Sequence, residues 1–152
     1  MTTFTDSQGN VFSLKLTVGA VDRIVGAGLP DLLSGNPQLI GQFYDSPLVA
    51  AKAVAVLIKD QLETLGVKGN PLDRFDGQTL KAALDAFYQE VVLFFQAAQR
   101  NDLETLCVEM RRLKAGQAEA QTEAVKQLSE KILSELPASL PSILAASPSG
   151  NS

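Results

Sequence analysis

The chain has 152 residues, of which 45% are hydrophobic and 20% are charged, a balance typical of one globular domain and too apolar for a fully disordered chain. Its 13 basic and 17 acidic residues leave a formal net charge of −4, so no overall positive field attracts nucleic acid and we expect no such partner. The sequence has no histidine and one cysteine, which excludes Cys/His zinc sites, Ser-His-acid triads and Cys-His dyads. We therefore expect a protein that is not an enzyme and binds no metal, nucleotide or redox cofactor.

The sequence also bears on the compartment. The first residues have neither the basic region nor the apolar stretch of a secretion signal, and one cysteine cannot form an internal disulfide. The longest apolar run, residues 48–58, is interrupted by Lys52 and is far shorter than the ~20 residues that span a bilayer. We expect no membrane association and a location in a reducing cytosol.

Residues 3–16 predict a β-hairpin. Phe4 precedes the turn signal at residues 6–10, and Phe12, Leu14 and Leu16 then alternate with more polar residues. Because two strands alone are marginal in water, the apolar face of this hairpin must pack on helices or on another sheet.

Two short helices are expected next. Thr17 can cap a helix that ends in the glycines of residues 26–28, with apolar residues Val18, Val21, Ile24 and Val25. After a turn near residues 31–37, a second short amphipathic piece contains Leu39, Ile40, Phe43 and Tyr44.

Ser46 and Pro47 form a strong helix start, an N-cap followed by proline at the first helical position. The expected helix ends at Gly66 and carries the apolar residues Leu48, Ala51, Val54, Ala55, Ile58, Leu62 and Leu65. Residues 67–77 then form a connector in which we expect Phe75 to contact the core.

Residues 78–99 have the most regular apolar spacing and predict a helix about 33 Å long. The apolar stripe consists of Leu80, Leu84, Phe87, Val91, Phe94 and Ala98. Adjacent residues on a helix diverge by about 100°, so of the two aromatics only Phe94 lies on this stripe, and one of Phe94 and Phe95 must find a second surface. We expect that surface to be inside the protein, with a partner as the alternative.

The C-terminal third starts as an amphipathic helix with Leu103, Leu106, Cys107, Met110 and Leu113. Residues 114–124 lose the wide apolar stripe, and a thin one returns at Val125, Leu128, Ile132 and Leu136. A straight helix over residues 102–136 would measure about 52 Å, more than the ~35 to 40 Å width of a compact domain, so we expect it to project or to bend near Gly116.

The fold class expected from these patterns is mainly α with an N-terminal β-hairpin (α+β). We expect a globular domain over residues 3–113 with four to five helices, a projecting or partner-bound helix over 114–136, and a flexible Pro/Ser-rich tail over 137–152. The expected core contains Phe12, Leu14, Ile58, Leu84, Phe87 and Val91. The expected partner-binding residues are Val125, Leu128, Ile132, Leu136, Leu140, Ile143 and Leu144.

Other candidate chemistry has simpler structural interpretations. Cys107 shares a stripe with apolar residues and has no histidine to activate it, so we expect a buried thiol. The glycines at 19, 26 and 28 lack the order of a phosphate-binding loop. The carboxylate pairs Asp73/Asp76 and Glu119/Glu123 lack other ligands and are expected to be solvated. The basic cluster at residues 111–114 is either a solvated face or a contact for an acidic partner.

Three segments, residues 15–33, 36–67 and 75–95, together resemble small bacteriophage proteins known as tail assembly chaperones or tail accessory proteins. The resemblance covers roughly residues 3–100. It rests on Leu16 to Gly19 opening the first helix, Asp31-Leu32-Leu33 after it, Asp45-Ser46-Pro47 opening the third, and an Ala/Leu-rich helix ending in Phe94-Phe95.

The resemblance implies a non-enzymatic chaperone in the host cell cytoplasm. Such a protein coats the long helical tape measure protein of the phage and recruits tail tube subunits to it. The apolar residues of the C-terminal third, by their own spacing, suit either a second copy of the same protein or a client helix. Two alternatives remain: a structural virion component, such as a head-tail connector or completion protein, and a phage adaptor or inhibitor of a host protein. A closed ring in solution would favour the connector, and a monomer or small oligomer that keeps tape measure fragments in solution would favour the chaperone.

Overall fold

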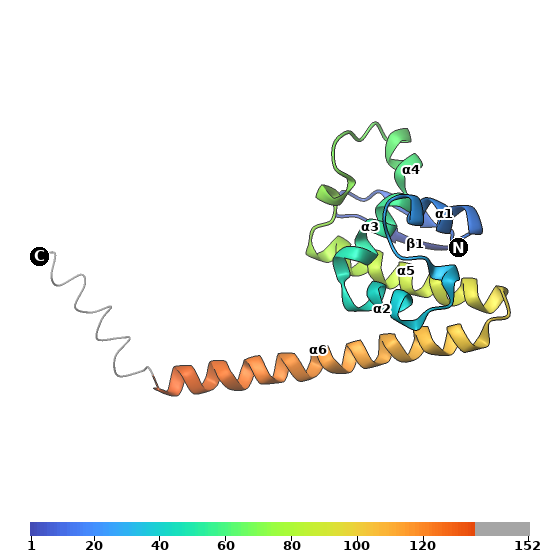
Figure 1. Ribbon diagram of the computed structural model, residues 1–152. Coiled ribbons are helices and arrows are strands. Elements are labelled where there is room, and N and C mark those ends of the chain that lie inside the picture. Colours follow the sequence, from blue (N-terminus) through green and yellow to red (C-terminus); the bar gives the residue numbers. More distant parts are fainter. Residues whose placement is uncertain (136–152) are drawn as a thin grey trace, which may run out of the picture. The chain divides into compact units, whose positions relative to one another are not determined.

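The computed structural model describes residues 1–135, which form a two-stranded antiparallel hairpin, six α-helices and two short 3-10 helices (Figure 1). The fold is therefore mainly α with an N-terminal β-hairpin, as the sequence predicts. The chain divides into two units, Met1–Lys114 and Ala115–Ser152. None of the helices within residues 1–135 has the length and apolar character needed to cross a membrane.

The hairpin consists of strands β1 (Thr2–Thr5) and β2 (Val11–Leu14). Phe4 pairs with Phe12 across the strands, and their ring centroids lie 5.4 Å apart on the buried face. In the turn, the carboxylate of Asp6 accepts two backbone N–H hydrogen bonds, each of 2.9 Å. The polar turn thus holds the register that places both aromatic rings in the core.

The hairpin is fixed by side chains of α5 (Gly77–Ala97), the helix that packs against β1. The buried Glu90 accepts a hydrogen bond from the N–H of Leu16 at 3.1 Å, and Thr79 accepts one from the N–H of Ser7 at 3.1 Å. The hydroxyl of Thr2 donates to the carbonyl of Ala86 at 2.9 Å. These contacts supply the helical support that a two-stranded sheet needs.

A glutamine closes the outer edge of β2. Gln61, in α4 (Lys59–Thr64), accepts a hydrogen bond from the N–H of Ser13 and donates one to its carbonyl, both at 2.8 Å. The side-chain amide thereby makes the two bonds that a neighbouring strand would make at that residue.

Asp6 also pairs with Arg74, at the end of the 3-10 helix η2 (Pro71–Arg74). The two side chains are 2% and 18% exposed, and the guanidinium nitrogen lies 2.9 Å from the carboxylate. Burial opposes ionisation of Asp6, but hydrogen bonds from Asn10 and Arg74 outweigh it and hold the pKa of Asp6 below its usual value. Next to Arg74, Phe75 packs on Phe4 at 6.2 Å between ring centroids, which confirms the expected contact with the core.

Polar caps start the helices at the predicted places. Thr17 caps α1 (Val18–Gly26) by accepting a hydrogen bond from the N–H of Ala20 at 3.1 Å, and Ser46 caps the third helix by accepting one from Val49 at 3.3 Å. The remaining early elements are η1 (Leu32–Ser34) and α2 (Pro37–Asp45), which are capped by Asp31 and Asn36.

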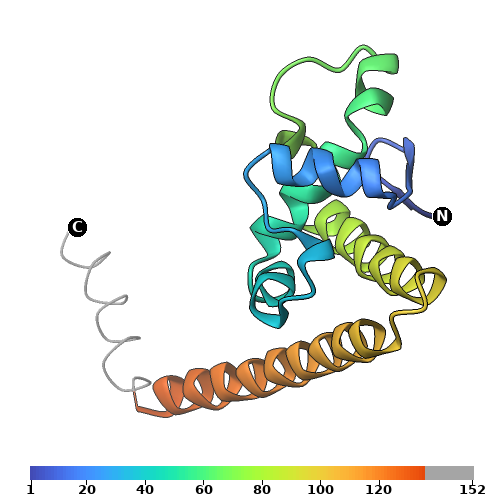
Figure 2. The same cartoon turned by 45° about the vertical axis from the view of Figure 1, so that its right-hand side comes forward.

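The helix expected from Ser46 to Leu65 is in fact two helices, α3 (Pro47–Leu57) and α4, so that prediction was wrong. The chain leaves helical geometry at the fully buried Ile58, which has φ −101° and ψ 5°. Helix α3 packs against α1, α2 and α5 (Figure 2) and buries mainly small side chains. Leu48 at the start of α3 and Leu65 at the end of α4 are exposed. Because α3 is apolar on nearly all sides, its sequence did not define a single inward face.

The stripe predicted for α5 was also partly wrong. Leu84 is only half-buried and lies at the margin of the core, and the buried aromatic at the end of the helix is Phe95 in place of Phe94. The face that approaches β1 carries smaller residues and one acid, namely Thr79, Ala83, Ala86 and Glu90. Small side chains allow close contact between helix and strand, but they contribute little to the apolar periodicity of a sequence.

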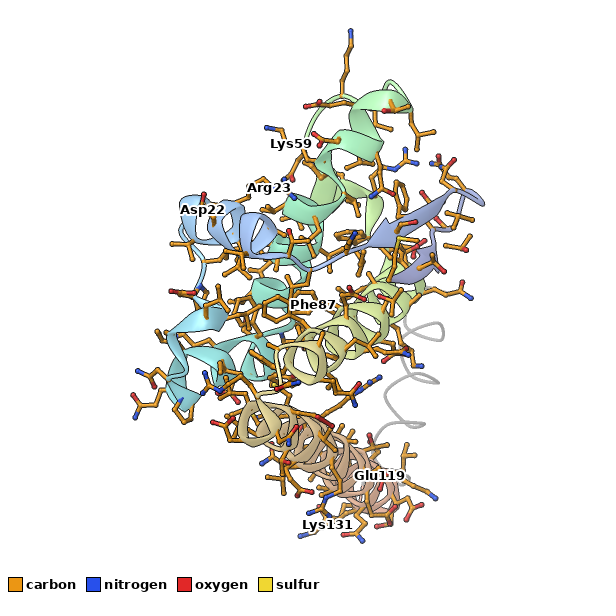
Figure 3. All side chains as sticks on the ribbon, turned by 90° about the vertical axis from the view of Figure 1, so that its right-hand side faces the viewer. Asp22, Arg23, Lys59, Phe87, Glu119 and Lys131 are labelled. Carbon is orange, nitrogen blue, oxygen red and sulfur yellow. The ribbon has the colours of Figure 1, made fainter. Side chains whose placement is uncertain are left out.

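The core joins the hairpin to α1, α2, α3, α5 and the start of α6. Phe87 is completely buried at its centre (Figure 3), and its ring lies 5.7 Å from that of Phe43. The other residues predicted for the core, apart from Leu84, are buried in the same cluster: Phe12, Leu14, Ile58 and Val91.

A short turn leads from α5 to α6 (Asn101–Glu135), in which Gln99 adopts a left-handed conformation with φ 58°. The N–H of Arg100 donates back to the carbonyl of Phe95 at 2.9 Å, which ends α5. Helix α6 continues through Gly116 without interruption.

Candidate protein-binding surface

Residues 115–135 of α6 are the described part of the second unit, and all of them are exposed. Val125, Leu128 and Ile132, here called the α6 stripe, are 62%, 57% and 45% exposed. Their spacing of three and four places them on one side of the helix. The other residues predicted for partner binding, Leu136, Leu140, Ile143 and Leu144, lie outside the described residues.

Leu133, which the apolar spacing did not predict as part of the surface, is 66% exposed beside Ile132. It lies about 100° around the helix from Ile132 and so falls outside the predicted stripe. Charged side chains, among them Glu119 and Lys131 (Figure 3), occupy other positions on the same segment. An exposed apolar stripe bordered by charge is the pattern of a helix that binds another helix.

The basic side chains of residues 111–114 form ion pairs with acidic residues of the same chain. Arg111 pairs with Asp85 at 3.1 Å, and its guanidinium carbon lies 5.9 Å from the centre of the Tyr88 ring. Arg112 pairs with Glu109 at 2.8 Å, and Lys114 pairs with Asp45 at 2.6 Å. These contacts favour the solvated-face interpretation over a site for an acidic partner.

The single thiol lies in an aromatic cluster. Cys107 is fully buried, as expected, next to Tyr44, whose ring stacks on Tyr88 at 4.6 Å between centroids. Burial raises the pKa of the Cys107 thiol and of the Tyr44 phenol, and it raises the pKa of Tyr88 to about 12. A neutral buried thiol without a neighbouring base is suited to packing and not to nucleophilic attack.

The carboxylate pairs are exposed, and Asp76 serves as the N-cap of α5 by accepting a hydrogen bond from the N–H of Thr79 at 2.8 Å. That bond holds the pKa of Asp76 below its usual value. Within residues 1–135, no cluster of three or more His, Cys, Asp or Glu side chains could hold a metal ion.

Two neighbouring hollows, which the sequence did not indicate, lie along α3 and α4. One of about 310 Å³ has a mainly apolar lining from Ala55, Val56, Leu62, Val67 and Pro71. The other, of about 320 Å³, includes Arg23 and Lys59 (Figure 3), and the two share Val56 and Lys59. The charged side chains around them are exposed, so neither hollow has the buried, converging polar groups that orient a small ligand.

No protein-family model, no curated protein and no solved structure matches this chain.

Proposed function

We propose that this chain is a non-enzymatic chaperone of phage tail assembly that binds an apolar helical segment of the tape measure protein in the host cytoplasm and helps to recruit tail tube subunits. The observation that carries this proposal is the α6 stripe, three large apolar side chains that are each about half exposed or more. The resemblance of residues 3–100 to tail assembly chaperones supplies the identity of the client.

The physical basis is the burial of apolar surface between two helices. Fully burying a Val, Leu or Ile side chain contributes about 1.5 to 3 kcal/mol, so three half-exposed side chains leave several kcal/mol available to a partner. A long tape measure helix exposes apolar stripes before the tube forms around it, and a cover for these stripes prevents aggregation. Tube subunits that bind the same stripes would then release the chaperone.

The test is co-expression with a fragment of a phage tape measure protein, measuring the fraction of the fragment that stays in solution after centrifugation. We expect the wild-type chain to raise that fraction several-fold and the triple variant Val125→Ser, Leu128→Ser, Ile132→Ser to lose most of the effect.

Leu113→Ser is the matched control, because Leu113 is similarly exposed on α6 but belongs to the first unit. Equal protection by the triple variant and the control would reject the α6 stripe as the client surface. A closed ring formed by the purified protein alone would favour the connector alternative.

A further inference from the structure

Helix α6 presents a heptad pattern in its second unit. Ala118, Val125 and Ile132 fall at the first position of successive heptads, and Gln121 and Leu128 fall at the fourth. All five are exposed. We infer that residues 118–132 pair in parallel and in register with the same segment of a second copy, forming a short two-stranded coiled coil that holds the protein as a dimer when no client is bound.

Within a parallel arrangement, the identity of the apolar residues favours two strands over three or four. Val125 and Ile132 are β-branched and occupy first positions, whereas Leu128 occupies a fourth position. In parallel coiled coils, β-branched residues at the first position with leucine at the fourth favour dimers over trimers and tetramers. A second copy therefore matches this surface in the branching of its side chains as well as in its apolar character.

Gln121 supplies the register. It is the polar member of the heptad core, one layer before Val125. Opposite an identical helix in register, its side-chain amide meets the same amide, and the two can satisfy each other by one donating to the other. A polar residue in the core of a coiled coil lowers its stability, and the pairing of Gln121 with the same residue of the other strand favours the in-register alignment.

The charges of the segment are compatible with a second copy. Glu119, Glu123, Lys126 and Glu130 take outer positions, and Lys131 takes a flanking position with no charged residue opposite it within residues 118–132. No like charges are therefore opposed across the contact. Glu135 falls at the next fourth position, so the contact ends at Ile132.

The length of the contact determines its strength. Residues 118–132 span about 22 Å of helix, little more than two heptads, and coiled coils this short are weak. The dimer should therefore dissociate on dilution. The dimer contact and the client site of the proposed function use the same α6 stripe, and only in this respect does the inference rest on that function. A client helix would therefore displace the second copy from the stripe.

Sedimentation equilibrium of the full chain, from roughly 1 µM to 1 mM, tests the assembly state. We expect the average mass to rise from one chain towards two. The triple variant Val125→Ser, Leu128→Ser, Ile132→Ser should remain a monomer at every concentration. Its far-ultraviolet circular dichroism should still show the helices of residues 1–114. Leu133→Ser, which removes an equally exposed leucine from an outer position, should dimerise like the wild type. A wild type that is monomeric at the highest concentration, or a triple variant that dimerises normally, would overturn the inference.

Cysteine cross-linking tests the orientation, because Cys107 is the only native cysteine and is buried. In a parallel dimer in register, Gln121→Cys and Ile132→Cys should each form a disulfide-linked dimer under mild oxidation, since identical positions lie within disulfide reach. An antiparallel pair can bring at most one of the two positions together, so cross-linking of only one, or of neither, would overturn the parallel arrangement.

The two proposals fail separately. A wild-type dimer that dissociates in the triple variant but leaves the tape measure fragment unprotected would retain the coiled coil and reject the chaperone. A protein that stays monomeric but protects the fragment would retain the chaperone proposal and reject the coiled coil.

Discussion

At the scale of single residues, the stability of the fold depends on closely packed aromatic rings in the core. Phe87 is completely buried, and its ring lies 5.7 Å from that of Phe43 in α2 and 5.8 Å from that of the adjacent Tyr88. Because protein cores are close-packed, little of the structure could move to fill the space left by a smaller side chain.

Phe87→Ala should therefore lower the free energy of unfolding by about 3 to 5 kcal/mol in urea titrations. Phe94→Ala is the control, because Phe94 is only half-buried and should cost clearly less. A loss below about 1 kcal/mol for Phe87→Ala would show that this face of α5 does not form the core.

The ion pair of Asp6 and Arg74 makes stability depend on pH. Because the pKa of Asp6 is lower in the folded than in the unfolded chain, its contribution is fully present above the unfolded value of ~3.9 and is lost as the pH falls through the lower folded value. Asp6→Asn should cost about 2 to 4 kcal/mol at pH 7, because it leaves Arg74 without its partner in a largely buried site.

Urea titrations between pH 7 and pH 2 test this role of Asp6. The stability of Asp6→Asn should fall less steeply than that of the wild type below about pH 4. Asp22→Asn, at an exposed site on α1, should follow the wild-type curve. A wild-type and an Asp6→Asn curve that stay parallel to pH 2 would contradict the assignment.

At the scale of elements, the hairpin is held in place by helices at both of its edges. On the side of β2, Gln61 takes the place of a third strand at Ser13. Because the Gln61 side chain bonds one residue of β2, it should slow hydrogen exchange at one backbone amide, that of Ser13.

Gln61→Leu should accelerate hydrogen exchange at the Ser13 amide by about tenfold or more, because one to two hydrogen bonds of roughly 1 kcal/mol each are lost. Gln89→Leu, at an exposed position of α5, should leave that amide unchanged. Unchanged exchange in Gln61→Leu would mean that the hairpin edge is protected by other contacts.

The elements also show which features a sequence encodes locally. The hairpin, the caps at Thr17 and Ser46 and the buried thiol were predictable, because turn and cap residues act over three or four positions. The break at Ile58 and the burial of Phe95 were not, since both depend on which neighbours surround a helix that is apolar on several sides. The apolar spacing of Val125, Leu128 and Ile132 in the candidate surface could also be read from the sequence, because a repeat of three and four residues is a local pattern.

At the scale of the whole molecule, the boundary between the two units falls at Lys114, whose ammonium group pairs with Asp45. Every residue of the described core precedes that boundary. The first unit therefore contains the contacts needed for its own stability.

A chain truncated after Lys114 should unfold cooperatively, with a melting temperature within a few degrees of the full-length value. Calorimetry of the two proteins at the same concentration measures the difference. Loss of a cooperative transition on truncation would show that residues 115–152 contribute to the core.

The anchoring of the hairpin has a consequence for synthesis on the ribosome. Its strands are complete once Leu14 has been added, but the side chains that hold it, Gln61, Arg74, Thr79 and Glu90, are added much later. At roughly 5 to 20 residues per second, several seconds separate the two events. During that interval Phe4, Phe12 and Leu14 have no core to enter, so we expect the nascent chain itself to bind the chaperones that recognise exposed apolar segments near the ribosome.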